Sequence, residues 1–132
     1  MNLTIQMKLL VSLAQVDGKV ADRERSYILN IGKANGISTD KVHQMIEEQH
    51  DVIVPQGLSP DEKFNYIYTL VQLMKIDERM YQEEIRFCST IATRLGYDQH
   101  VLFDLMLNVK SNEMDESEVN NLKALTQKHL KK

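Results

Sequence analysis

Residues 10–25 are LVSLAQVDGKVADRER, and residues 70–85 are LVQLMKIDERMYQEEI. The two stretches align without a gap from Leu10 and Leu70 onward, and the same offset pairs Gly36 with Gly96. A duplicated helical unit cannot easily bury its apolar face alone, so two copies packed about a pseudo-twofold axis are the natural architecture. The sequence therefore predicts a fold built from two related halves.

The rest of the chain predicts helices around these stretches. Apolar residues recur at helical spacing almost everywhere, and only two Pro and five Gly interrupt them. Helices are predicted over residues 2–16, 22–35, 39–49, 60–76, 82–95, 98–109 and 116–131. We therefore expect one all-α domain over residues 1–132, a compact bundle of about seven helices. Its predicted parts are a first three-helix repeat (about 3–48), a linker (about 50–58), a second repeat (about 60–110) and a C-terminal helix (about 116–131).

Composition and charge argue against several classes of function. The chain has 132 residues, of which 42% are hydrophobic and 27% charged, as in an ordinary single domain. Its net charge of -3 and scattered basic residues argue against nucleic acid as a partner. No apolar run approaches the roughly 18 residues of a membrane span, so direct membrane insertion is not expected. With Cys88 as its single cysteine and no charged start to its first apolar stretch, the chain is expected in the cytoplasm.

Each copy carries an Asp at a predicted helix end and a Glu seven residues later, in the first turn of the next helix. These pairs are Asp17 with Glu24 and Asp77 with Glu84. The first copy resembles the D-G-x-V-x-x-x-E signature of TerB-like domains, the family of tellurite-resistance proteins. It is also similar to the related amino-terminal domain of membrane-anchored DnaJ-type co-chaperones. The resemblance covers roughly residues 3–110.

The resemblance implies a compact cytoplasmic helical domain linked to metal or chemical stress and to assemblies near the membrane. It also implies acidic residues that bind a divalent cation. The signature falls on Asp17, Gly18, Val20, Asp22 and Glu24 in the first copy, and on Asp77, Met80 and Glu84 in the second. The second copy has Glu78 in place of the glycine and Gln82 in place of Asp22. It therefore lacks a tight-turn residue and one oxygen ligand.

The predicted metal ligands are Asp17, Asp22, Glu24, Asp77 and Glu84, for calcium, magnesium or manganese. Such cations take about six to eight oxygen ligands, so a complete shell would need both turns together with backbone carbonyls and water. The alternative stays open, because an acid at a helix start also caps free amides and complements the helix dipole. The spacing argues against an EF-hand, since its first ligand position would be Leu13.

No catalytic pattern is found. The four His are far apart in sequence, and the chain contains no H-E-x-x-H, G-x-S-x-G or phosphate-binding glycine loop. We therefore expect a non-enzymatic domain that binds a divalent cation, a protein partner near the membrane, or both, through its acidic turns. The competing hypothesis is a purely structural adaptor or co-chaperone-type module without a metal site. The sequence sets no oligomeric state.

Overall fold

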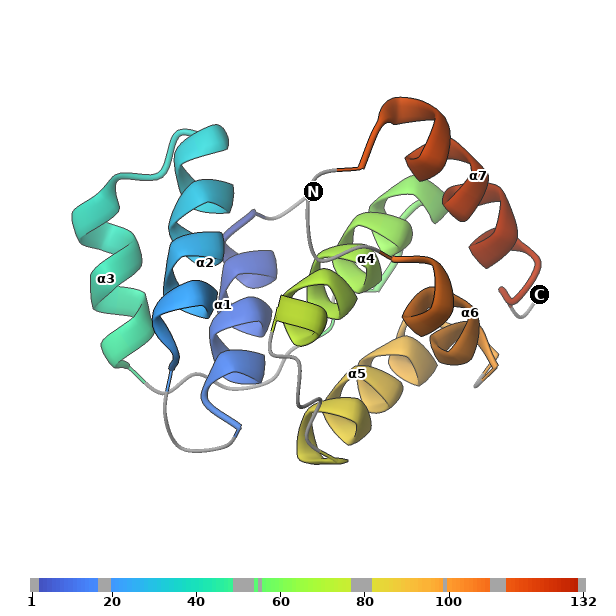
Figure 1. Ribbon diagram of the computed structural model, residues 1–132, viewed down its shortest axis with the longest axis horizontal. Coiled ribbons are helices and arrows are strands. Elements are labelled where there is room, and N and C mark those ends of the chain that lie inside the picture. The colour runs from blue at the N-terminus through green and yellow to red at the C-terminus, as the bar shows by residue number, and fades with distance from the viewer. Residues whose placement is uncertain are drawn as a thin grey trace.

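The computed structural model describes residues 3–16, 20–48, 54, 56–76, 82–98, 100–109 and 114–130. Over these residues the chain forms seven helices and no strand, which confirms the predicted all-α class (Figure 1). The helices are α1 (Leu3–Ala14), α2 (Asp22–Ala34), α3 (Thr39–Glu47), α4 (Pro60–Ile76), α5 (Gln82–Arg94), α6 (Val101–Asn108) and α7 (Glu116–Gln127). None of these helices is long and apolar enough for a membrane span.

Local capping explains where several helices begin. Ser59 and Glu62 make reciprocal bonds at the start of α4, each side chain accepting the other residue's backbone N–H at 3.2 and 3.1 Å. Asp115 and Glu118 do the same at the start of α7. The Ser38 hydroxyl accepts an amide of α3 at 3.3 Å. These bonds satisfy N–H groups that a helix start leaves without a helical partner.

Two glycines end α2 and α5. Gly36 and Gly96 have φ of +81° and +95°, in the left-handed region that side chains disfavour. After each glycine, the next amide donates back to a carbonyl five residues earlier, at 2.9 and 3.0 Å. This is the Schellman arrangement, and it turns the chain toward the third helix of each predicted repeat.

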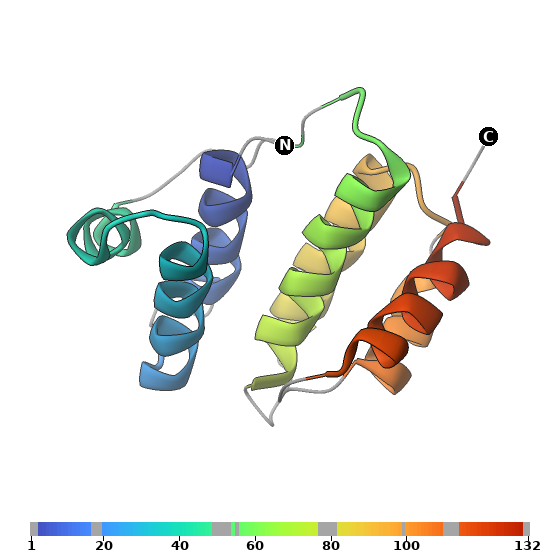
Figure 2. The same cartoon turned by 90° about the horizontal axis from the view of Figure 1, so that it is seen from above.

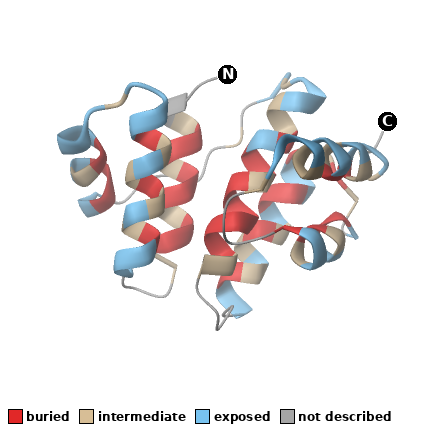
Figure 3. Cartoon of the chain, turned by 45° about the horizontal axis from the view of Figure 1, so that its top comes forward, coloured by how far each residue is buried: buried red, intermediate tan, exposed pale blue. Residues whose placement is uncertain are grey.

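The core is built around α4. This helix contacts α1, α2, α5, α6 and α7, and buried residues concentrate along α1 and α4 (Figure 3). The first three helices lie on one side of α4, and α6 and α7 lie on the other (Figure 2). α5 runs alongside α4 and also contacts α1. α4 therefore joins the two predicted repeats through one continuous apolar core.

The C-terminal helix ends earlier than predicted, at Gln127 rather than near residue 131. Beyond it the chain turns, and the His129 carbonyl accepts the Asp98 amide from the segment between α5 and α6. The His129 ring also lies 2.6 Å from the Asp104 carboxylate of α6. These contacts replace further helical bonds, which is why the prediction was wrong at this end.

Candidate functional site

The first acidic turn leads to a buried carboxylate. Glu24 lies in the first turn of α2 and is only 2% exposed. Its Oε1 accepts the backbone N–H of Ala21 at 3.2 Å, so the carboxylate caps its own helix. Asp22 opens the same helix and is exposed. The predicted ligand Asp17 lies outside the described residues.

The second acidic turn also leads to a buried carboxylate. Glu84 lies in the first turn of α5 and is 1% exposed. One turn further along, Cys88 is fully buried, as expected for a core residue. Desolvation raises the pKa of the Cys88 thiol, and the nearby Glu84 charge raises it further. The predicted ligand Asp77 lies outside the described residues.

The structure does not bring the described acids together. No three His, Cys, Asp or Glu side chains among the described residues are grouped so that they could hold a metal ion. The Cα atoms of α2 and α5 also stay more than 8 Å apart. Over the described part of the chain, Glu24 and Glu84 therefore do not come together in one site.

The sequence did not predict a polar network between α1, α2 and α4. The Tyr27 hydroxyl donates to Gln72 Oε1 at 2.7 Å, and the Gln72 amide donates to the Tyr68 hydroxyl at 3.3 Å. Gln6 reaches the Thr69 hydroxyl at 3.3 Å. Desolvation raises the pKa of Tyr27 well above its ordinary value, and the charge of Tyr68 adds to the shift. Polar residues within the otherwise apolar run of α4 were the available signal.

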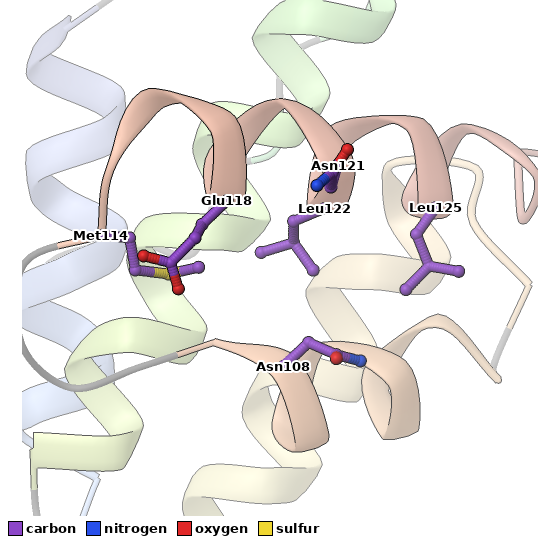
Figure 4. Close-up of a pocket in the computed structure, with 6 residues that line it drawn as sticks. All are labelled: Asn108, Met114, Glu118, Asn121, Leu122 and Leu125. Carbon is purple, nitrogen blue, oxygen red and sulfur yellow. The ribbon is translucent and has the colours of Figure 1, made fainter.

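A groove of about 230 Å³ runs between α6 and α7 (Figure 4). It is lined by Asn108, Met114, Glu118, Asn121, Leu122 and Leu125. The two leucine side chains point from α7 into the space above α6 (Figure 4). On α6 itself, Phe103 and Leu107 are 67% and 81% exposed. Sequence reasoning missed this pair because helical spacing identified only the inward stripe of α6.

A second hollow, of about 270 Å³, lies where α5 passes the end of α1. It is lined by Val16, Glu83, Arg86, Phe87, Thr90, Ile91 and Arg94. Two of these side chains are cationic and one is anionic, so this hollow carries more positive charge than the groove between α6 and α7. The hollow is therefore an apolar surface site with two exposed arginines at its rim.

Comparison with known proteins identifies no relative. The chain matches no family model, no curated protein and no solved structure. The resemblance to TerB-like domains therefore rests on the residues of the two signatures alone.

Proposed function

We propose that this chain is a non-enzymatic, TerB-like cytoplasmic domain of the tellurite- or metal-stress type. In this proposal its two acidic turns bind a divalent cation, a protein partner, or both. The observation that carries the proposal is the burial of Glu24 and Glu84 at equivalent positions of the two aligned stretches. Burying a carboxylate is unfavourable unless hydrogen bonds, a counter-charge or a cation stabilise it. Two such residues, each after an acidic turn, point to a shared role.

Several contacts support the proposed pseudo-twofold repeat. The bounds of α2 and α5 correspond at both ends, Asp22 with Gln82 and Ala34 with Arg94. Gln15 donates to the Ile46 carbonyl at 2.8 Å, and its counterpart Lys75 donates to the Met106 carbonyl at 2.7 Å. Each residue therefore ties the end of one helix to the end of the third helix in its own half. In addition, the first helices of the two halves, α1 and α4, contact each other. Each of them also contacts the second helix of the other half, α1 with α5 and α4 with α2, as a twofold relation requires.

The cation chemistry favours the first turn. Asp17, Asp22 and Glu24 offer three carboxylates, whereas the second copy has Gln82 in place of the middle one. Calcium, magnesium and manganese prefer such oxygen ligands, and backbone carbonyls and water would complete the shell. Because α2 and α5 do not meet over their described residues, Glu24 and Glu84 would serve separate ions. More backbone carbonyls and water would then replace the ligands expected from the other turn.

Thermal unfolding tests the cation. Chelator-treated protein should melt several degrees higher at saturating calcium, magnesium or manganese, since a ligand at 100 times its Kd adds about 2.7 kcal/mol. Asp17→Asn should abolish most of the shift, and Asp77→Asn a smaller part. Glu24→Gln separates capping from cation binding. Glutamine can still accept the Ala21 amide, but it lacks the negative charge of the proposed ligand. A variant that keeps its basal midpoint but loses the ion response would support a cation site.

The adaptor function remains the second candidate, and the Glu24 cap favours it. The bond from Ala21 already gives this carboxylate a structural role without any ion. On this alternative, no divalent ion would shift the midpoint of the wild-type protein. A defined protein partner would instead be retained in the presence of chelator. That pair of results would overturn the cation proposal.

A further inference from the structure

Phe87 lines the hollow beside α5, and at the aligned position of the first half Tyr27 makes a contact that a phenylalanine cannot make. Between α2 and α4, the Tyr27 hydroxyl closes the interface by donating to Gln72 at 2.7 Å. The residues at the equivalent positions are Phe87, which has no hydroxyl, and Ser12. The Ser12 hydroxyl turns back to the Lys8 carbonyl of its own helix, at 2.8 Å. Over the described residues, the interface of α5 with α1 therefore has no equivalent closure by this pair.

The hollow has an apolar floor and a charged rim. Ile91 is buried, and Val16 and Phe87 are half-buried, so they form a surface that an apolar side chain can cover. Arg86 and Arg94 are exposed at the rim, eight residues apart. At 1.5 Å per residue this spacing is about 12 Å along α5, or a little over two turns.

We propose that this hollow docks an acidic amphipathic helix of a partner protein. One apolar side chain of that helix fills the hollow, and two carboxylates about eight residues apart pair with Arg86 and Arg94. The guanidinium group suits this role because its planar fork binds a carboxylate through two parallel hydrogen bonds. Charge complementarity is local, because the whole chain carries a net charge of -3 and repels acidic partners elsewhere.

Glu83 gives the site a direction. It lines the same hollow one turn before Phe87, at the N-terminal end of α5. A partner carboxylate there would meet a like charge, so the acids of the partner helix must lie toward Arg86 and Arg94. This surface uses none of the proposed cation ligands. Its failure and the failure of the proposed cation site are therefore separable.

Binding of a synthetic helix to the full chain tests the proposal. The probe is a fluorescent amphipathic peptide of about 18 residues, or five turns, with leucine midway between two glutamates eight residues apart. The control peptide has glutamine in place of both glutamates. The charge reversal Arg86→Glu with Arg94→Glu should weaken binding of the probe at least about tenfold, because two attractions become repulsions. The matched control, Arg23→Glu with Lys33→Glu on exposed positions of α2, should bind as the wild type does.

A second variant tests the hollow without changing charge. Ser12→Gln with Phe87→Tyr copies the polar closure of the first half, so it should also weaken binding at least about tenfold while the helical circular dichroism stays unchanged. If this variant fails to fold, the arginine reversal still decides. Equal binding of both peptides, unchanged affinity in the arginine variant, or no binding to wild type would each overturn the proposal. So would amide shifts confined to the groove between α6 and α7.

Discussion

Replacing Gly32 by alanine should destabilise the protein, although alanine is the better helix former. A Cβ at this position of α2 would lie 2.7 Å from Cγ2 of Val42 and 3.3 Å from Cε of Met7. The methionine end can rotate away. Val42 is fully buried in α3, and its branched side chain has few alternative rotamers. We therefore expect α2 and α3 to be pushed apart.

Two opposing terms set the size of this effect. Removing a glycine from a helix interior gains up to about 1 kcal/mol. Overpacking a well-filled core loses about 1 to 3 kcal/mol, and a contact below 3.0 Å to a stiff side chain belongs in the middle of that range. The expected net loss for Gly32→Ala is about 1 kcal/mol. In a domain of this size, that lowers the melting midpoint by about 4 °C.

Urea and thermal unfolding, followed by circular dichroism, measure the change. Ala92 is the matched control, because it is the counterpart of Gly32 in the second copy, is buried in α5 and already carries the Cβ. Ala92→Gly should also lose about 1 kcal/mol, from helix propensity and lost packing. The two substitutions are chemically opposite, yet both should destabilise. A gain of about 1 kcal/mol in Gly32→Ala would refute the tight approach of α2 to α3.

Three further outcomes follow from side chains that are buried or half-buried. Tyr27→Phe removes the 2.7 Å bond to Gln72 and should lower the free energy of unfolding by about 1 to 2 kcal/mol in urea; an unchanged value would contradict the network. Lys75→Met removes the donor to two carbonyls at the end of α6, so the amides of α6 should exchange faster while those of α2 do not. Burial raises the pKa of Tyr97 to about 12 and also raises that of Cys88. Because both groups are harder to ionise when folded, their stabilisation is complete below the unfolded pKa values, about 8.5 for cysteine and 10 for tyrosine. The free energy of unfolding should therefore fall from about pH 8.5 toward pH 12, and Cys88→Ala should flatten the lower part of that curve.

Local rules predicted the helix boundaries that depend on local bonds. Ser59 with Glu62, and Gly36 at the end of α2, act within one turn of the chain, so their residue types were sufficient. The end of α7 depends instead on His129 meeting Asp104, 25 residues earlier. Such a contact is set by how α6 and α7 pack, and no spacing along the chain encodes it.

The candidate site shows the same division. The sequence marked Glu24 and Glu84 as first-turn acids, but it did not show that both are almost completely buried. Burial depends on the packing of neighbouring helices over the turn, which a capping pattern does not encode. The bond of Tyr27 to Gln72 spans 45 residues and was likewise invisible. What a repeat in the sequence did offer was a set of paired positions at which the two halves can be compared.

Those pairs separate positions where the halves perform the same task from positions where they diverge. Gln15 and Lys75 differ in charge, yet both donate to carbonyls at the end of a third helix. Ser12 and Phe87 differ from their counterparts at both sides of one interface, and these two residues make no closing hydrogen bond in the described part of the chain. Phe87 lines the open hollow, whereas its counterpart Tyr27 donates a hydrogen bond across the equivalent interface of the first half. The first half closes the equivalent interface with a hydrogen bond, so the helical unit is able to close it. The open hollow therefore agrees with the proposed docking of a partner helix, because functional surfaces commonly give up some stability.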